Sequence, residues 1–436
     1  MSALARYFRF HGKKVSGYDK TETVLTRELV KEGIPVHYTD NPDEAPKDAQ
    51  LIVYTPAIPG TQRELEFYKK NDYTLVKRSE VLGMITNSSF NICVAGTHGK
   101  TTISTMIAHL LRDSGYGCNA FLGGISVNYQ SNYWSNERNV CVVEADEYDR
   151  SFLRLSPNIA VISAMDPDHL DIYGTAEVME EAFIEFSGRL KEGGRLFYKY
   201  GLKRAAELKG PAKESYSLDN TGADYYATSL KEINGGYVFD IVSRNWKLES
   251  VALNMGGLHN VENTIVAAAI AHGLEIEDEK IRSAVAAFRG VKRRFEYVVR
   301  NDDWVMVDDY AHHPEELRAL ITSAKRLFPD RKCTVIFQPH LFTRTRDLAD
   351  GFAESLDLAD ETLLLPIYPA RELPIEGVSN KMIFDRMTIK DKHMLSKQEV
   401  LDYVDNMKGG ARLLITAGAG DIDQLVEPLG KKLVKK

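Results

Sequence analysis

Short apolar runs alternate with longer amphipathic segments along the whole chain. From Leu317 to Leu327 the apolar side chains recur at helical spacing, which predicts a helix over residues 315–328. The apolar runs have the length and flanking residues of buried strands, and they lie at 91–95, 139–144, 158–166, 304–310, 333–340, 362–369 and 412–418. This alternation is typical of α/β domains built on mostly parallel sheets.

The pattern divides the chain into three blocks, and we predict domains at residues 1–90, 91–290 and 291–436. In the first block we expect helices at 3–10 and 22–32, and strands at 14–17, near 36 and at 51–54. In the second block we expect antiparallel strands over 225–253 around the turn Asn234-Gly235-Gly236, then a helix over 261–272.

Composition and charge narrow the classes of function. Of the 436 residues, 44% are hydrophobic and 27% are charged, as in ordinary folded proteins. The 55 Lys and Arg residues against 62 Asp and Glu residues give a net charge of −7, which argues against general nucleic-acid binding. No membrane-helix or signal-peptide pattern occurs, so we expect no membrane insertion and a cytoplasmic location. Without a CxxC pair, Cys93, Cys118, Cys141 and Cys333 are expected to be reduced core residues.

The strongest chemical motif follows the predicted strand at 91–95 and precedes an amphipathic helix. It consists of Gly96, Thr97, His98, Gly99, Lys100, Thr101 and Thr102. In a phosphate-binding loop, glycines let backbone N–H groups surround phosphate oxygens, the lysine reaches the β- and γ-phosphates, and the next hydroxyl ligates Mg²⁺. Only two residues separate the glycines here, whereas the general loop has four. The alternative is a glycine-rich turn that contains Gly-Lys-Thr by chance.

Acidic clusters follow two of the predicted strands. One cluster is 144–149, which begins with Glu144, and the other is 166–171, which contains His169. Ligands gather at the carboxyl ends of strands in open α/β sheets, so both clusters are expected to face the phosphates. Carboxylate oxygens are ligands that Mg²⁺ prefers. Solvated loop ends are the alternative for either cluster alone.

With these residues the chain resembles the Mur ligases, which are ATP-dependent amide-bond ligases of bacterial cell-wall synthesis. Motifs of that family occur as G-T-H-G-K-T-T at 96–102, E-A-D-E at 144–147, D-H-x-D at 168–171, G-x-H-N-x-x-N at 257–263, R-R-F at 293–295 and D-D-Y-x-H-H-P at 308–314. Further matches are Q-P-H at 338–340, F-T-R-T-R at 342–346, Y-P-A-R-E at 368–372 and G-A-G-D at 418–421. The match spans the whole chain. Among the Mur ligases, the motifs most resemble those of the members that join L-alanine to UDP-N-acetylmuramate.

The resemblance implies an α/β fold of three domains. The first is a Rossmann-like domain that binds the UDP-sugar, and the second is a phosphate-loop ATPase-type domain with a mostly parallel sheet. The third is a small Rossmann-like domain that binds the amino acid and closes over the site. The implied substrates are UDP-N-acetylmuramate and L-alanine, and the implied cofactors are ATP and Mg²⁺.

The resemblance also implies residue roles around the triphosphate. Lys100 and the loop amides hold the β- and γ-phosphates, while Thr101 and Glu144 ligate one Mg²⁺. His169 corresponds to the ligand of a second Mg²⁺, which bridges the γ-phosphate and the substrate carboxylate.

On the adenosine side, His259, Asn260 and Asn263 correspond to the element that contacts adenine. Arg294 is implied to contact ATP phosphate, and Asp309 is implied to contact the ribose. As an alternative, His259 and Asn260 cap the helix that we expect to begin near residue 261.

His313 and Arg344 are the implied contacts for the incoming amino acid and the sugar-linked carboxylate. His312 and His313 could instead be ordinary loop residues, and His340 is as well explained by a structural role. Surface or ion-pair positions are the alternative for Arg293 and Arg346.

The implied chemistry activates a carboxylate in two steps. The lactyl carboxylate attacks the γ-phosphorus to give an acyl phosphate and ADP, and the L-alanine amine then attacks the acyl carbon and releases phosphate. Two alternatives share parts of the pattern. One is a recycling ligase that adds a tripeptide to the same UDP-sugar, and the other is a nucleotide-binding protein without ligase activity.

The N-terminus departs from the family pattern. Residues 1–5 match the end of the family's G-x-G-G-x-G-M-S element, and the strand and glycine-rich turn that precede this point in the family have no counterpart. We therefore expect a strand and turn upstream of Met1 in a functional form. We also expect the 436-residue form to bind the UDP-sugar poorly.

Overall fold

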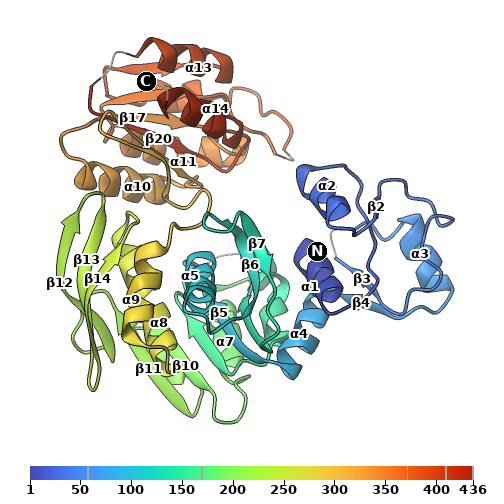
Figure 1. Cartoon of the computed structure of the whole chain (residues 1–436). Helices are drawn as coiled ribbons and strands as arrows, with labels where there is room; N and C mark the ends of the chain where they lie inside the picture. The colour runs from blue at the N-terminus through green and yellow to red at the C-terminus, as the bar shows by residue number, and fades with distance from the viewer. Residues whose placement is uncertain (56–57, 168–169, 371, 408–409, 435–436) are drawn as a thin grey trace. The chain divides into compact units, whose positions relative to one another are not determined.

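A computed structural model describes residues 1–55, 58–167, 170–370, 372–407 and 410–434 (Figure 1). The chain forms two compact units that interleave along the sequence. Unit 1 comprises residues 1–125, 130–226 and 265–284, and unit 2 comprises residues 126–129, 227–264 and 285–436. The three domain boundaries predicted from the sequence stay predictions.

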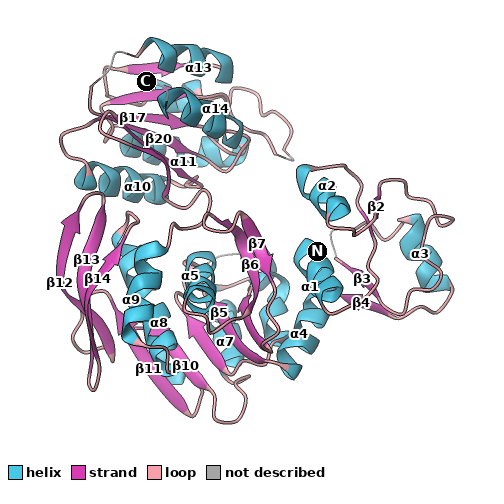
Figure 2. Cartoon of the chain, viewed as in Figure 1, coloured by secondary structure: helices cyan, strands magenta, loops and turns pink. Residues whose placement is uncertain are grey.

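The centre of unit 1 is a parallel sheet (Figure 2). Its strands, in spatial order, are β11 (Ala212–Ser217), β10 (Arg195–Lys199), β9 (Ile159–Ile162), β5 (Phe90–Ala95), β8 (Val140–Glu144) and β6 (Asn119–Ser126). The neighbours of β5 are thus β8 and β9, which both come later in the chain. Because parallel strands end at the same edge of a sheet, the residues that follow β5, β8 and β9 lie side by side.

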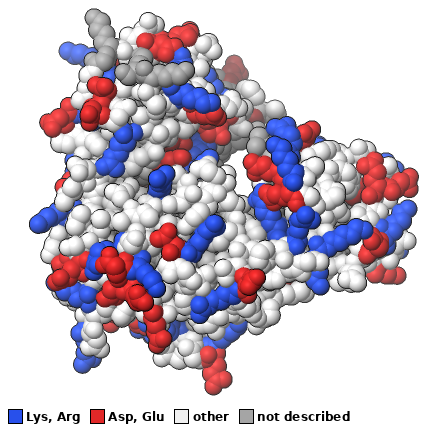
Figure 3. All heavy atoms as spheres, viewed as in Figure 1, with Lys and Arg blue, Asp and Glu red and all other residues white. Residues whose placement is uncertain are grey.

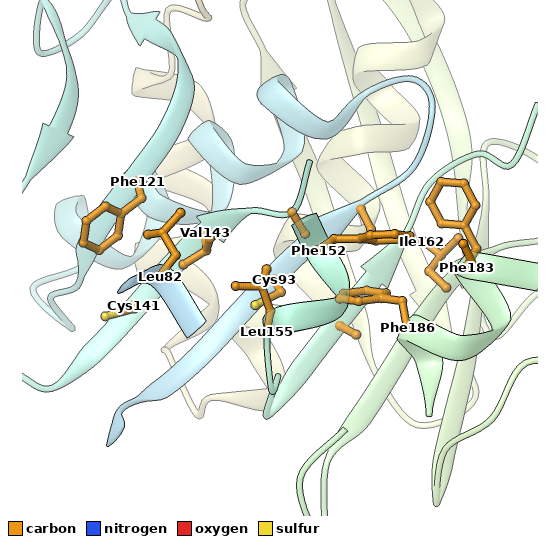
Figure 4. Close-up of a cluster of buried hydrophobic side chains, with 14 of the residues drawn as sticks. Leu82, Cys93, Phe121, Cys141, Val143, Phe152, Leu155, Ile162, Phe183 and Phe186 are labelled. Carbon is orange, nitrogen blue, oxygen red and sulfur yellow. The ribbon is translucent and has the colours of Figure 1, made fainter. Parts of the chain in front are cut away.

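Buried aromatic rings cover one face of this sheet (Figure 4). Phe152 lies in the 3-10 helix η1 (Tyr148–Arg154), and its ring stacks on Phe186 at 5.1 Å and meets Phe183 edge-on at 5.3 Å. Phe183 and Phe186 belong to α7 (Ala176–Ser187). All three rings are buried, so the loop after β8 is anchored to the core close to its acidic residues.

The strands of residues 1–88 form two separate parallel pairs. β1 (Gly17–Tyr18) pairs with β2 (Val36–His37), and β3 (Ile52–Tyr54) pairs with β4 (Leu75–Lys77). The helices are α1 (Ser2–Phe10), α2 (Val24–Lys31), α3 (Arg63–Lys70) and α4 (Arg78–Ser88). The helices expected at 3–10 and 22–32 are present. The strand expected at 14–17 lies instead at 17–18, and the upstream strand and turn stay a prediction.

Unit 2 contains a six-stranded sheet. Its spatial order is β15 (Glu296–Arg300), β16 (Trp304–Asp309), β20 (Arg412–Ala417), β17 (Lys332–Phe337), β18 (Glu361–Leu364) and β19 (Lys392–Met394). Only the β15–β16 pair is antiparallel among these neighbours. The helices around it are α10 (Pro314–Leu327), α11 (Phe342–Leu356), α12 (Lys381–Phe384), α13 (Lys397–Asn406) and α14 (Asp423–Val434). Helix α10 agrees with the helix predicted at 315–328.

The predicted antiparallel strands are β12 (Tyr225–Ile233), β13 (Gly236–Ser243) and β14 (Lys247–Leu253). They extend the sheet beyond β11, and with β7 (Ser131–Trp134) at the opposite edge the sheet has ten strands. Asn234 and Gly235 connect β12 to β13 with φ values of 49° and 68°, as a two-residue type I′ turn requires. The Tyr297 hydroxyl donates to the Gly235 carbonyl at 2.5 Å. The tip of this hairpin is therefore fixed within unit 2.

Further helices are α5 (Lys100–Asp113), α8 (Leu258–Gly273) and α9 (Asp278–Ala287). No helix in the described ranges is both long and apolar enough to span a bilayer. Basic and acidic side chains are interspersed on the face shown in Figure 3, in line with the net charge of −7. The four cysteines are buried and free.

We predict that Phe152→Ala lowers the free energy of unfolding by about 3–5 kcal/mol, because it leaves a cavity between Phe183 and Phe186. Urea denaturation of the full chain, followed by circular dichroism, measures this change. Phe10→Ala is the control, since the Phe10 side chain is 49% exposed and its loss is expected to cost about 0.5 kcal/mol or less. Equal losses in the two variants would contradict the assigned core.

Candidate active site

The glycine-rich loop connects the end of β5 to the start of α5. Gly96 has φ = 133° and Gly99 has φ = 83°, values that favour glycine. At the end of β9, the Ser163 hydroxyl donates to the His98 carbonyl, and it also lies 3.2 Å from the Ala95 carbonyl. A Cβ on Gly96 would lie 2.2 Å from Ser163 Oγ. The neighbouring strand therefore determines the path of the loop, and no side chain fits at its first glycine.

Two glutamates, Glu144 at the end of β8 and Glu147 in the loop that follows, bind the first residues of α5. Lys100 Nζ donates to Glu147 Oε1 at 2.7 Å, and Thr101 Oγ1 donates to Glu144 Oε1 at 3.0 Å. The Gly123 N–H donates to Glu144 Oε2 at 2.8 Å, where a Cβ would lie 2.4 Å from both carboxylate oxygens. The structure thus brings together the predicted residues Lys100, Thr101 and Glu144. It adds Glu147 and Gly123 to them.

The chemistry of these groups fits Mg²⁺. The Thr101 hydroxyl and the Glu144 carboxylate are neighbouring hard oxygen donors beside a loop of backbone N–H groups. Burial raises the pKa of Glu144, and the nearby Lys100 charge opposes that shift. A bound cation would stabilise the ionised carboxylate in this buried position.

The other predicted loop residues have different surroundings. The Thr97 N–H donates to the Ala164 carbonyl at 3.1 Å, and Thr97 Oγ1 accepts from the Asp166 N–H at 3.2 Å. Thr102 is buried in α5, whereas the His98 side chain is exposed. His169, the predicted ligand of a second Mg²⁺, lies outside the described residues.

The Asn260 and Asn263 side chains bond locally at the start of α8. That helix begins at Leu258, so the expected start near residue 261 is wrong by about one turn. Asn260 Nδ2 donates to the Gly256 carbonyl at 2.7 Å, and Asn263 Nδ2 donates to Asn260 Oδ1 at 3.2 Å. The Asn260 amide therefore stabilises the junction between loop and helix from inside the first turn. Together with His259, these residues cluster at one helix end.

The predicted ribose contact, Asp309, accepts hydrogen bonds from two backbone N–H groups. Its carboxylate binds the N–H groups of Phe295 and Ala311, each at 2.7 Å. Burial raises its pKa to about 6, while those two bonds and the Arg294 charge oppose the shift. The Arg294 guanidinium lies 5.7 Å from the centroid of the Tyr310 ring. Asp309 therefore holds the turn that carries Arg294 against the end of β16.

A cluster of imidazole and phenol rings surrounds the region of Arg344. His312 Nδ1 lies 2.9 Å from the Tyr310 carbonyl, and the His312 ring meets the His340 ring edge-on at 6.1 Å. The His340 ring stacks on Tyr368 at 5.8 Å. Burial and the Arg344 charge lower the pKa of both histidines. The cluster therefore combines one guanidinium with imidazoles that are neutral near pH 7.

His313, the predicted amino-acid contact, precedes α10 as its N-cap residue. Glu316 Oε2 accepts from the N–H groups of His312 and His313, at 3.0 and 3.2 Å. Of the two adjacent histidines, His312 is the one that meets His340. His312 belongs to the D-D-Y-x-H-H-P motif and His340 to the Q-P-H motif. Both motifs were noted in the sequence, but neither histidine was among the predicted contacts.

Three models of one family match this chain: the Mur ligase family catalytic domain at residues 1–89, the Mur ligase middle domain at 94–271, and the Mur ligase glutamate ligase domain at 293–422. The chain belongs to the Mur ligase family. This Mur ligase is 48% identical to the UDP-N-acetylmuramate–L-alanine ligase of Parabacteroides distasonis, over 100% of this chain and 95% of that protein. The enzyme of the same name from Flavobacterium johnsoniae is 43% identical, over 99% and 95%.

Solved structures agree with this assignment. The UDP-N-acetylmuramate–alanine ligase of Thermotoga maritima superposes with a TM-score of 0.82 at 26% identity, covering 100% of this Mur ligase and 96% of that chain. A murein peptide ligase from Psychrobacter arcticus has the same fold, with a TM-score of 0.65 at 21% identity over 99% and 96%.

The buried acid Asp308, which precedes Asp309 in β16, makes the stability of the protein depend on pH. Thr416 Oγ1 donates to Asp308 Oδ1 at 2.6 Å, and Arg293 Nε lies 3.6 Å from Oδ2. Burial raises the pKa of Asp308 to about 7, although the Thr416 bond and Arg293 oppose the shift. Between about pH 4 and pH 7, Asp308 is therefore protonated in the folded state and ionised in the unfolded state. Over that window this acid makes the free energy of unfolding fall as pH rises.

We predict that Asp308→Asn removes this pH dependence. Between pH 4 and pH 8 the stability of the variant relative to the parent is expected to rise by up to about 4 kcal/mol. Urea denaturation at several pH values measures the difference. Asp303→Asn is the control, because it changes an exposed aspartate directly before β16. A stability difference between Asp308→Asn and the parent that stays constant with pH would rule out this assignment.

Proposed function

We propose that this protein is an ATP-dependent ligase that joins L-alanine to the lactyl carboxylate of UDP-N-acetylmuramate, in the synthesis of peptidoglycan precursors. The observation that carries the proposal is the 48% identity to such a ligase over the full chain. The contacts of Lys100 and Thr101 with Glu147 and Glu144 support an intact nucleotide site.

The first step transfers the γ-phosphoryl group of ATP to the lactyl carboxylate. A carboxylate oxygen forms a bond to the γ-phosphorus, the bond to the β–γ bridging oxygen breaks, and ADP leaves. In our proposal the amides of residues 96–102 and the Lys100 ammonium bind the phosphates and reduce the repulsion between substrate and triphosphate. We propose that Arg294 contacts ATP phosphate and that His259, Asn260 and Asn263 provide the adenine side. Asp309 holds the turn that carries Arg294 and is the proposed ribose contact.

We propose that Thr101 and Glu144 hold one Mg²⁺, and that His169 binds a second. When bound, these ions would neutralise phosphate charge. The oxygen donors of Thr101 and Glu144 suit such an ion.

The second step forms the amide bond. The L-alanine nitrogen attacks the acyl carbon, the acyl–oxygen bond breaks, and phosphate and a proton are released. We propose that Arg344 binds the carboxylate of L-alanine, with His312, His313 and His340 around it. A guanidinium suits a carboxylate because it offers paired N–H donors in one plane. Water must be excluded during this step, because acyl phosphates hydrolyse.

The domain roles follow the three blocks. We propose that residues 1–90 bind the UDP-sugar, residues 91–290 bind ATP and residues 291–436 bind the amino acid. ATP and a nucleotide-activated sugar are both present inside the cell, so we place the reaction in the cytoplasm.

The proposal predicts which substrates are needed for turnover. Phosphate release from ATP and Mg²⁺ is expected only when both UDP-N-acetylmuramate and L-alanine are present, and mass spectrometry is expected to show the alanyl product. The tripeptide L-alanyl-γ-D-glutamyl-diaminopimelate replaces L-alanine in a parallel reaction. Turnover with the tripeptide alone would favour the recycling ligase. Binding of ATP without turnover on either acceptor would favour a nucleotide-binding protein.

A second prediction separates the two adjacent histidines. His312→Ala is expected to raise the KM for L-alanine about tenfold, equivalent to the loss of about 1.4 kcal/mol of binding, while the KM for ATP stays unchanged. His313→Ala is expected to have the smaller effect, because His312 is the residue that meets His340. Glu315→Gln alters an exposed side chain in the same helical turn and controls for changes in α10. The reverse order of effects would support His313 as the amino-acid contact.

A further inference from the structure

The Lys100 ammonium is already paired with an anion of the protein. Nζ donates to Glu147 Oε1 and to the Gly96 carbonyl, each at 2.7 Å. The Glu147 side chain is only 1% exposed, and the Lys100 side chain is 14% exposed. An ammonium has three N–H donors, so two are engaged in these contacts.

This pair lies where the triphosphate is proposed to bind, and the inference rests on that proposed role of residues 96–102. A phosphate oxygen on the same tetrahedral nitrogen would lie about 4.5 Å from the Glu147 carboxylate oxygen, at ordinary hydrogen-bond lengths. Both groups are anions, and repulsion between them is strong in a partly buried setting. The carboxylate and the triphosphate therefore compete for one ammonium.

The backbone around Glu147 is held in place. Its carbonyl accepts from the Tyr173 hydroxyl at 2.6 Å and from the Arg150 N–H at 2.9 Å. The Arg150 guanidinium lies 5.3 Å from the Tyr173 ring centroid. Asp149 and Arg150 both have φ = 53°, a left-handed conformation that persists only where surrounding contacts enforce it. The carboxylate is therefore held beside Lys100 by the fold around it.

Glu144 and Glu147 have different partners although they are only three residues apart. Glu144 binds the Thr101 hydroxyl and the Gly123 N–H, so its contacts are with neutral groups. Glu147 forms the ion pair with Lys100. The metal-ligand role proposed for Glu144 therefore leaves the role of Glu147 unassigned.

We infer that Glu147 is an internal competitor of the nucleotide, which lowers the affinity of the site for ATP and ADP by neutralising Lys100. It sets affinity through Lys100 and is a positioning residue. The same competition favours product release, because the Glu147 carboxylate competes with bound ADP for the Lys100 ammonium.

Glu147→Gln tests this inference, since it retains the size and an acceptor oxygen and removes the charge. The dissociation constants for Mg²⁺–ATP and ADP, measured by calorimetry, are expected to fall about tenfold. The nucleotide-free variant is expected to melt at a lower temperature, because Lys100 loses its anion, and to gain more from added ATP. Loss of a merely structural residue would weaken nucleotide binding, which is the opposite sign.

Glu180→Gln is the matched control. Glu180 lies on α7, its side chain is 5% exposed, and its Oε1 accepts from Lys203 Nζ at 2.9 Å. This variant also removes one buried charge next to a lysine, and its ATP affinity is expected to equal that of the parent. A tenfold gain in both variants would overturn the inference.

Unchanged or weaker ATP binding in folded Glu147→Gln would also overturn it. If that variant does not fold, Glu147→Asp decides, because it keeps the charge and withdraws the oxygen from Lys100 by about one bond. Tighter binding by this variant supports competition, and unchanged or weaker binding overturns it. Lys100→Ala separates this inference from the proposed function: parent-like ATP affinity in Lys100→Ala would refute the loop as the triphosphate site.

Discussion

The pairing of two glutamates with two consecutive residues of α5 determines much of the structure around the phosphate loop. Glu144 accepts a hydrogen bond from the Thr101 hydroxyl, and Glu147 forms an ion pair with the Lys100 ammonium. A buried carboxylate without such a partner is costly, so the end of β8 and the loop after it must keep both carboxylates in position. The left-handed backbone at Asp149 is tolerated for this reason. The aromatic core beneath that loop provides the rigid support.

In unit 2 the buried acids Asp308 and Asp309 accept hydrogen bonds mainly from neutral groups. Asp309 accepts two backbone N–H groups, and Asp308 accepts the Thr416 hydroxyl with Arg293 farther away. Burial outweighs these contacts, so the pKa of each acid stays raised. In unit 1 the Glu147 carboxylate therefore pairs with the Lys100 ammonium, which is also the proposed contact of the triphosphate. In unit 2 the acids fix the turn that presents Arg294.

The sequence was sufficient for the features that depend on local pattern. The central parallel strands are continuous apolar runs, and the loop at residues 96–102 has a fixed order of residue types, so both were predictable. Strands of two or three residues, such as β1 and β19, are too short to show a period. Ser163, which follows β9, contacts the loop, and Gly123 of β6 binds Glu144, although both residues are distant from their partners in sequence. Only the strand order of the sheet brings them to those partners.

Adjacent residues of one motif have different surroundings in the structure. His312 and His313 belong to one motif, but His313 is the N-cap of α10, and the preceding residue is the one that meets His340. That difference comes from backbone geometry at the helix start, which residue types alone do not specify.

The same geometry bears on how the proposed site accepts a small amino acid. L-alanine offers only a carboxylate, an ammonium and a methyl group, and it arrives as a zwitterion. A site with several cations would bind the carboxylate and repel the ammonium. The cluster around Arg344 avoids this, because burial and the Arg344 charge lower the pKa of His312 and His340 and keep both rings neutral near pH 7. One fixed positive charge among neutral rings can bind the carboxylate and still admit the ammonium.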